Sequence, residues 1–307
     1  MEASLYGRQV IESLAGEFKQ LYLCPGGEGQ ASYDDIVKRG RDVSEKSLSH
    51  FCMDEKDKLE YLDTPAGRVL CVTLNKRRDF VTFLQIMANR CEAVDIPDTQ
   101  GASMIDGVIN WTKIKAHKKE FLKAEADKGN LFPDWSAEFK RFTSDKRNYL
   151  DSVIALSAGP YNAVSAKRLG LEADEWTALS DRIRKYHECT HFVCRRLFPE
   201  KKDAVWDELV ADAVGIYAAF GKYDPEMEKL FLGIEGDRYI GGRLENYIES
   251  YTKDAAGSGP DRADVLSGLA VKISGVIKAF DEMITKSMDA DPFEIAFLLE
   301  ESMNKLW

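Results

Sequence analysis

The sequence predicts an α+β fold that is predominantly helical, and three observations support this prediction. Apolar residues recur every three or four positions over most of the chain, which is the period of an amphipathic helix. GRVLCVTL (67–74) is instead apolar and β-branched, which favours a strand. Pro199 ends the longest helical pattern and separates two helices. We therefore expect an N-terminal α+β region over 1–130 and a mainly helical region over 131–307, which could also form one continuous domain.

In the N-terminal half, helices are expected to alternate with short breaks. Helical spacing runs over 4–21 and stops at CPGGEG (24–29), whose proline and glycines favour a loop. A second helix is expected after SYDD (32–35), where Ser32 is a candidate cap. The remaining elements expected here are a helix at 78–90, a helix at 108–126 and a loop at 129–135.

The C-terminal half is expected to be helical except at its start. VIALSAGPYNAV (153–164) has two short apolar pieces around a Gly-Pro break, which suits an extended hairpin or an irregular edge segment. A long helix over 172–198 closes at Pro199, and the next helix is expected over roughly 200–220 because proline suits a first helical turn. Later helices are expected at 226–233, 240–252, 263–285 and 292–305.

Composition and charge narrow the range of partners. The formal net charge of -10 and the pI near 5.1 argue against nucleic acid or an anionic membrane, because phosphate-binding surfaces need concentrated Lys and Arg. The first residues lack the pattern of a secretory signal, and no apolar run approaches the ~18 residues of a membrane helix. Six scattered cysteines are expected to be reduced thiols. We expect a cytoplasmic protein with no nucleic-acid or membrane partner.

The segment KYHECTHFV (185–193) places two histidines four residues apart, with a glutamate directly after the first. On a helix, His187 and His191 lie about 40° apart around the axis and roughly 6 Å apart along it, so both imidazoles can reach one ion. Glu188 lies about 100° further round, where it can reach a water on that ion without ligating the metal. In this HExxH arrangement the imidazoles hold Zn²⁺ and the glutamate is the general base.

The next helix offers a third ligand. In WDELVADAVG (206–215), Glu208 and Asp212 are four apart and share one face. The break at Pro199 allows an antiparallel helical hairpin that brings Glu208 opposite the histidines and completes a His₂Glu site. Asp212 can then accept the second ring N–H of a ligating histidine. Apolar neighbours imply a largely buried helix, where unpaired carboxylates would be costly.

HECTH followed by DELVAD resembles the gluzincin branch of the zincin metallopeptidases, whose pattern is HExxH plus a downstream ExxxD or ExxAD. The resemblance covers about 187–215 and implies a zincin-like catalytic domain, with an active-site helix followed by a glutamate helix. It implies a zinc-dependent hydrolase that cleaves an amide bond in a peptide or protein substrate. The implied roles are zinc ligands for His187, His191 and Glu208, general base for Glu188, and ligand orientation for Asp212.

Two further roles follow from the resemblance. Zincins pair substrate backbone with the strand before the active-site helix, and 153–164 is the segment in that place, unless it is a plain surface hairpin. An oxyanion needs a polarising donor, and no histidine follows His191, so a tyrosine or arginine would have to serve. Tyr239 is the catalytic candidate, with Arg238, Arg243 and Tyr247 beside it in GDRYIGGRLENY (236–247).

Several alternatives compete with this interpretation. Cys189 and Cys194 suggest a structural zinc, but Cys189 lies about 200° around the helix from His187. A di-iron carboxylate bundle needs a second ExxH pair, and the sequence has none. Neither a G-x-S-x-G nucleophile motif nor a phosphate-binding glycine loop is present. The main rival is a non-catalytic, zincin-like metal-binding protein with a regulatory or interaction role. Glu188 argues against it, because a structural zinc needs no base.

Overall fold

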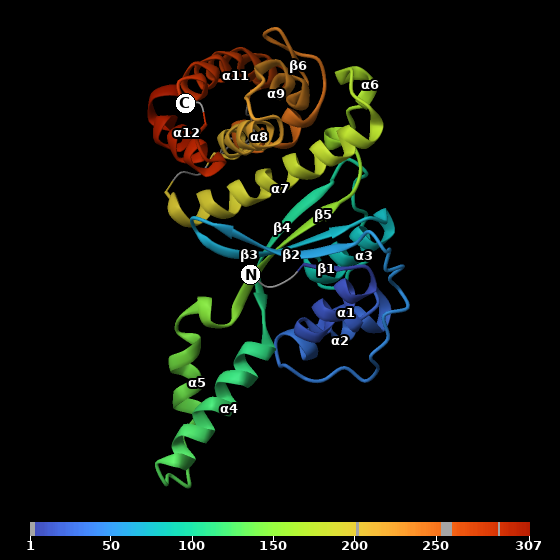
Figure 1. Cartoon of the computed structure of the whole chain (residues 1–307), viewed down its shortest axis with the longest axis vertical. Helices are drawn as coiled ribbons and strands as arrows, with labels where there is room; N and C mark the ends of the chain where they lie inside the picture. Colours follow the sequence, from blue (N-terminus) through green and yellow to red (C-terminus); the bar gives the residue numbers. More distant parts are fainter. Residues whose placement is uncertain (1–3, 201–202, 253–259, 288) are drawn as a thin grey trace. The chain divides into compact units, whose positions relative to one another are not determined.

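The computed structural model describes residues 4–200, 203–252, 260–287 and 289–307, which fold into two compact units (Figure 1). Unit 1 consists of Met1–Leu62 and Arg68–Ala158, and unit 2 consists of Asp63–Gly67 and Gly159–Trp307. Unit 1 combines a sheet with helices, whereas unit 2 is mainly helical and contains a short two-stranded sheet. The expected α+β class with mainly helical content is confirmed.

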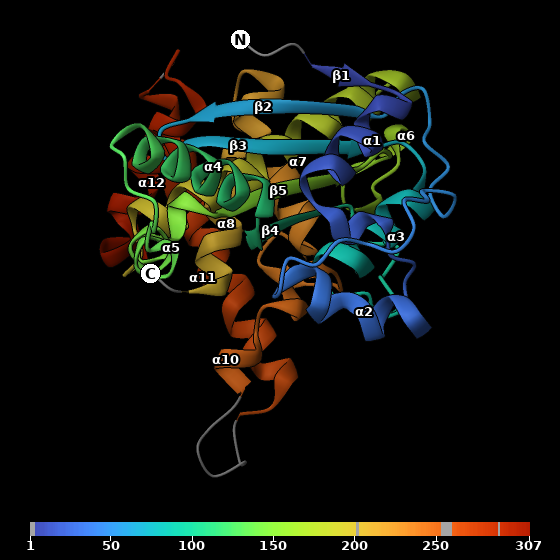
Figure 2. The same cartoon turned by 90° about the horizontal axis from the view of Figure 1, so that it is seen from below.

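The sheet of unit 1 has five strands in the order β1-β2-β3-β5-β4 (Figure 2). The expected strand at 67–74 is confirmed as β3, and it runs parallel to β5. Strands β2 and β4 were not expected, because polar residues interrupt their apolar pattern. The strands are β1 (Leu5–Tyr6), β2 (Lys58–Thr64), β3 (Gly67–Leu74), β4 (Ala102–Ile109) and β5 (Leu150–Ser157).

Strand β5 corrects the expectation of a hairpin or edge segment at 153–164. It pairs with β3 on one side, where Leu70 lies opposite Val153, and with β4 on the other, where Ala102 lies opposite Leu156. Its last six residues are buried, and a strand covered on both faces reads as a continuous apolar run. Because both of its edges are already hydrogen-bonded, β5 has no free edge to pair with a substrate backbone.

Helices α1 (Arg8–Glu17), α2 (Gly27–Val37) and α3 (Arg77–Met87) accompany this sheet (Figure 1). The apolar faces of α1 and α3 share one hydrophobic core with residues of β3 and β5. A 3₁₀ turn, η1 (Lys19–Tyr22), follows α1. Helix α2 begins at Gly27, inside the segment expected to be a loop, so Ser32 lies within the helix and is not its cap.

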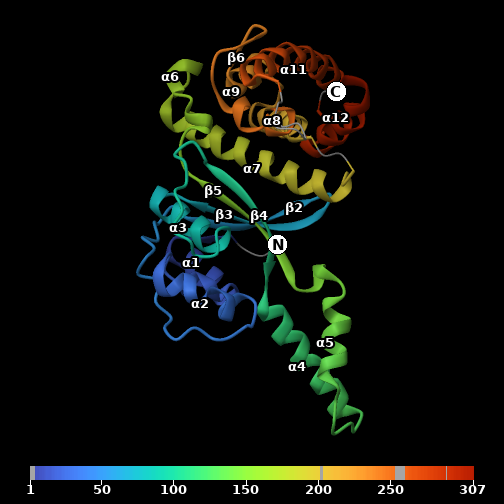
Figure 3. The same cartoon turned by 180° about the vertical axis from the view of Figure 1, so that it is seen from behind.

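Helices α4 (Trp111–Asp127) and α5 (Trp135–Thr143) form a hairpin inserted between β4 and β5. Figures 1 and 3 show this hairpin extending away from the sheet of unit 1. The helix expected at 108–126 is confirmed from Trp111 onward, because the Asn110 side chain accepts two backbone N–H groups and starts the helix there. Helix α5 was not expected, and Asp134 caps it in the same way.

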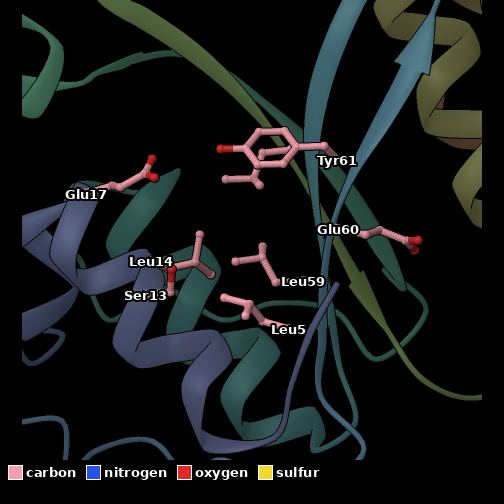
Figure 4. A pocket seen from close by; sticks show the side chains of 8 residues that line it. Leu5, Ser13, Leu14, Glu17, Leu59, Glu60 and Tyr61 are labelled. Carbon is pink, nitrogen blue, oxygen red and sulfur yellow. The ribbon is translucent and has the colours of Figure 1, made fainter. Parts of the chain in front are cut away.

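A pocket of about 290 Å³ lies in unit 1 between α1 and the strands beside it (Figure 4). Leu5, Leu14 and Leu59 point toward one another across this pocket, while the Glu60 side chain points away. None of the residues predicted for the metal site lines it. The lining residues are Leu5, Ser13, Leu14, Glu17, Leu59, Glu60, Tyr61 and Leu70.

Unit 2 is built around the two long helices that the sequence predicted on either side of Pro199. Helix α7 spans Ala173–Leu197 and helix α8 spans Ala204–Phe220, with Asp203 capping α8 through two backbone N–H groups. Most of α8 is buried. The other helical elements are η3 (Tyr161–Ala163), α6 (Ala166–Leu169), α9 (Pro225–Leu232), η4 (Arg243–Asn246), α10 (Glu249–Thr252), α11 (Arg262–Thr285) and α12 (Pro292–Leu306).

The two central helices approach each other closely at Gly215. A Cβ atom added there would lie 2.9 Å from the carbonyl oxygen of Ile183 on α7, nearer than side chains normally come. Glycine therefore lets the backbones of α7 and α8 pack directly against each other. This contact fixes the spacing of the two helices that carry the candidate metal ligands.

The helix expected at 240–252 is wrong. The short strands β6 (Ile234–Glu235) and β7 (Arg238–Tyr239) precede it, and only η4 and α10 are helical within it. Gly242 packs against Gly233, where an added Cβ would lie 2.8 Å from the Cα atom of Gly233. Because of this contact and the positive φ of 104° at Gly241, the chain turns here and does not begin a helix. Among the helices of the described residues, none is long and apolar enough to cross a membrane.

Candidate metal centre

Three predicted ligands converge in unit 2. His187 and His191 lie one turn apart on α7, and Glu208 faces them from α8. The two Nε2 atoms are 3.1 Å apart, and each lies 3.5 Å from an oxygen of the Glu208 carboxylate. Ligands at 2.0–2.1 Å from a tetrahedral metal are separated by roughly 3.3 Å. The observed separations are close to that value, so the group could hold a metal ion.

The polar atoms of the cluster also suit a cation. His187 and His191 are each 6% exposed, and both Glu208 Oε2 and His191 Nδ1 are buried without a hydrogen-bond partner. Burial opposes the charge on Glu208, but the hydrogen bond and charge of His191 outweigh it and lower the pKa of the carboxyl. A buried, ionised carboxylate between two imidazoles is an arrangement that a divalent metal ion would neutralise.

A proton occupies this cluster at neutral pH. Burial lowers the pKa of His191, but the hydrogen bond and charge of Glu208 reverse this effect and raise the pKa to about 9. His191 is therefore protonated at pH 7 and pairs with Glu208. A metal ion that binds both imidazoles has to displace this proton, because only a neutral imidazole nitrogen can ligate.

Asp212 sets the orientation of His187. Its Oδ1 atom lies 2.9 Å from His187 Nδ1, and the Asp212 side chain is fully buried. The carboxylate only accepts hydrogen bonds, so Nδ1 carries the hydrogen and the lone pair of Nε2 faces the Glu208 carboxylate. This is the tautomer that a metal ligand requires.

Two further side chains hold Asp212 in place. The Tyr161 hydroxyl donates to Asp212 Oδ1 at 2.7 Å and lies 3.2 Å from His187 Nδ1, while Arg243 pairs with Asp212 Oδ2. Arg243 also donates to the Tyr161 hydroxyl at 3.1 Å and lies 3.9 Å from Glu208 Oε2. Burial raises the pKa of Tyr161, so its hydroxyl remains a neutral donor.

Tyr161 and Asp207 were not predicted as residues of this site. Tyr161 lies in η3, 26 residues before His187 and 51 before Asp212, and its backbone N–H donates to Ser180 Oγ of α7 at 2.8 Å. No spacing rule connects it to the HExxH segment. Asp207 precedes Glu208, and its Oδ2 atom lies 3.8 Å from His191 Nδ1. A search for acids near both histidines, and not only on the Glu208 face, would have found it.

The remaining candidates differ in their surroundings. Glu188 is 8% exposed on α7, and its charge contributes to the raised pKa of His191. Tyr239 is not brought to the cluster by any hydrogen bond of the described residues, and its hydroxyl bonds to the N–H and carbonyl of Gly242, both at 2.8 Å. Tyr247 lies beside Arg243, whose Cζ atom is 5.9 Å from the centre of the Tyr247 ring. Cys189 and Cys194 are buried and do not belong to the His-His-Glu group.

Residues 12–306 match a family of unknown function, DUF7005, and the chain belongs to this family. No curated protein and no solved structure matches the chain. The chemistry of the metal centre is therefore the basis for a functional conclusion.

Proposed function

We propose that the chain is a zinc-dependent hydrolase, a gluzincin-like metallopeptidase that cleaves an amide bond in a peptide or protein substrate. One observation carries the proposal: His187, His191 and Glu208 meet at ligand-to-ligand distances of 3.1 to 3.5 Å. Two imidazoles and one carboxylate match the ligand set of catalytic zinc sites, which leave a fourth position for water or substrate. Glu188, next to the first ligand, is the additional feature that favours catalysis over a structural role.

Each residue of the cluster has a distinct task in this proposal. His187, His191 and Glu208 hold the zinc ion, and Asp212 keeps His187 in the ligating tautomer with support from Tyr161 and Arg243. A zinc ion in such a site supplies Lewis acidity that lowers the pKa of a water toward ~7.

Glu188 acts as the general base. It takes a proton from the attacking water and passes it to the leaving amine, so one carboxylate serves both halves of the reaction. The carboxylate is 8% exposed. Low exposure limits the competing bulk water and strengthens the electrostatic attraction between the carboxylate and the proton it receives.

Three side chains are candidates for the oxyanion donor. Tyr239 would have to exchange its two hydrogen bonds to Gly242 for the substrate oxygen. Arg243 remains charged because its partner Asp212 stabilises the guanidinium against the effect of burial. Tyr247, whose ring lies 5.9 Å from the Cζ atom of Arg243, is the third candidate donor.

A second candidate function is a metal-binding protein without turnover. The observation that favours it is that Tyr239 and Arg243 are both engaged in hydrogen bonds within unit 2. In such a protein the same three ligands hold a metal that stabilises the pairing of α7 with α8. Glu188 then has no chemical task.

Glu188→Gln distinguishes the two functions. The zinc-loaded wild type and variant are incubated with a peptide library, and cleavage is followed by mass spectrometry. We expect equal zinc content and a loss of turnover of about 10²- to 10⁴-fold, the usual contribution of a general base. Glu175→Gln, an exposed glutamate of the same helix, is the matched control and should keep full activity. Equal turnover in Glu188→Gln and the wild type would contradict the proposed base, and a zinc-loaded wild type without turnover on peptides or folded proteins would favour the second function.

A further inference from the structure

A cysteine and a histidine form a close pair in unit 1. The Sγ atom of Cys24 lies 3.5 Å from Nδ1 of His50, within the range of a sulfur hydrogen bond. Cys24 is exposed and His50 is partly buried. Cys24 opens the CPGGEG segment, which the proposed metal site does not use.

A backbone carbonyl fixes the tautomer of His50. Nε2 of the ring lies 3.0 Å from the carbonyl oxygen of Leu21, which can only accept, so Nε2 carries the hydrogen. In the neutral ring, Nδ1 then presents its lone pair to Cys24, and the thiol donates. Burial lowers the pKa of His50 and Arg78 adds to this effect, against the Leu21 hydrogen bond and the charge of Asp79. The ring is therefore neutral at rest, and the geometry leaves the Nδ1 lone pair as the acceptor for the thiol hydrogen.

The start of α2 holds the backbone of Cys24. Gly29 lies in the first turn of α2, and a Cβ atom there would lie 1.9 Å from the carbonyl oxygen of Cys24. Gly26, the N-cap position, makes no side-chain cap and donates its N–H to the carbonyl of Cys91 at 2.6 Å. The backbone of Cys24 is therefore held against the first turn of α2, which fixes the position of the residue beside His50.

We propose that Cys24 is a nucleophilic thiol with His50 as its proton acceptor, and that small disulfides modify it by thiol–disulfide exchange. A nucleophile in hydrogen-bond contact with a base, and a base oriented by a third group, is the arrangement of activated cysteines. Here the three parts are Cys24, His50 and the Leu21 carbonyl.

The reaction balances without a further reagent. Nδ1 of His50 accepts the thiol proton, and Cys24 Sγ forms a bond to one sulfur of the disulfide while the original S–S bond breaks. The leaving thiolate then takes the proton from His50. Cys24 is oxidised to a mixed disulfide, and the other half of the reagent is reduced to a thiol.

Cys52 provides an internal control. It is exposed like Cys24, but its backbone N–H bonds to Asp79 at 2.8 Å. Desolvation and the Asp79 charge raise the pKa of the Cys52 thiol, which opposes thiolate formation. The remaining cysteines, Cys71, Cys91, Cys189 and Cys194, are buried.

The test uses the full chain at pH 7 with two neutral reagents, iodoacetamide and hydroxyethyl disulfide, and peptide mass spectrometry gives the rate at each cysteine. We expect Cys24 to react roughly tenfold or more faster than Cys52 with both reagents, because Cys24 contacts a base whereas its surroundings raise the pKa of Cys52. His50→Asn keeps an acceptor oxygen without a comparable base and should slow Cys24 about tenfold. His50→Gln is the second variant, and an unchanged Cys52 rate in either one shows that the fold is intact.

Three outcomes would overturn the proposal. The first is a wild-type Cys24 rate no higher than that of Cys52. The second is an unchanged Cys24 rate in a folded His50 variant, which would mean that the imidazole does not activate the thiol. The third is fast alkylation by iodoacetamide without reaction with hydroxyethyl disulfide, which would exclude disulfide exchange.

Discussion

Replacing Asp212 with asparagine should disable His187 as a metal ligand while changing almost no volume. Asp212 accepts hydrogen bonds on both oxygens, from Tyr161 and His187 at Oδ1 and from Arg243 at Oδ2. Asparagine offers one accepting oxygen and one donating NH₂ group. The oxygen will face Arg243, because a guanidinium has only donors and cannot hydrogen-bond to an NH₂ group.

The NH₂ group then points at Nδ1 of His187 and donates to it. The imidazole responds by carrying its hydrogen on Nε2, which is the atom that should bind the metal. Restoring the ligating tautomer would leave two buried donors facing each other, at a cost of about 2 to 3 kcal/mol. That cost corresponds to a loss of zinc affinity of roughly 30- to 150-fold.

The assay is a competition titration of zinc against a chromophoric chelator, with wild type beside Asp212→Asn and Asp207→Asn. Asp207 lies 3.8 Å from His191 Nδ1, beyond hydrogen-bond distance and partly exposed, so its variant should lose less than about threefold. Circular dichroism in the presence of a chelator checks that each variant is folded. An affinity of Asp212→Asn within threefold of the wild type, or an equal loss in Asp207→Asn, would refute this reasoning.

Four further predictions concern the ligand cluster and the packing of α7 against α8. Tyr161→Phe removes one hydrogen bond to the partner of His187 and should weaken zinc binding by about 1 kcal/mol, roughly fivefold, in the same titration; unchanged affinity would remove the tyrosine from the site. Glu208 outweighs the effect of burial and raises the pKa of His191 to about 9, so zinc competes with a proton below that pH. The apparent affinity for zinc should rise about tenfold per pH unit from pH 7 and level off above pH 9. An affinity that does not change with pH would contradict the displacement of a proton. For the metal-free protein, the pH dependence of stability has the opposite sign. The pair of protonated His191 and Glu208 stabilises the fold below the ordinary histidine pKa, so thermal stability measured in chelator should fall as the pH rises through 9. Gly215→Ala should lower the free energy of unfolding by about 1–3 kcal/mol, because the added methyl group forces α7 and α8 apart. Gly268 has open space around it on α11, so Gly268→Ala should be neutral or stabilising. Equal melting temperatures of the two variants would refute the close contact at Gly215.

The ligand cluster could be predicted from the sequence because its geometry is mostly local. His187 and His191 share a face through the helical period alone, and Glu208 needs only one antiparallel turn after Pro199. Tyr161 could not be predicted, since it lies 26 residues from His187 and 51 from Asp212 and reaches them through tertiary packing.

The errors in the fold have similar physical causes. Strand β5 was expected at an edge, because an apolar run around a Gly-Pro break shows burial but not which strands lie beside it. Ser32 was expected to cap a helix, but α2 already starts at Gly27, in a glycine-rich segment that normally indicates a loop. In both cases long-range packing decided the structure against a local rule.

The metal content of the purified protein tests the central claim most directly. Wild type, His187→Ala and Glu208→Ala are purified without added metal, and zinc per chain is measured by plasma mass spectrometry, then again after zinc supplementation and desalting. We expect about one zinc per chain in the wild type and a sharp reduction in both variants, because two remaining ligands cannot hold the ion tightly. No zinc in the supplemented wild type, or full occupancy in Glu208→Ala, would contradict the His₂Glu assignment.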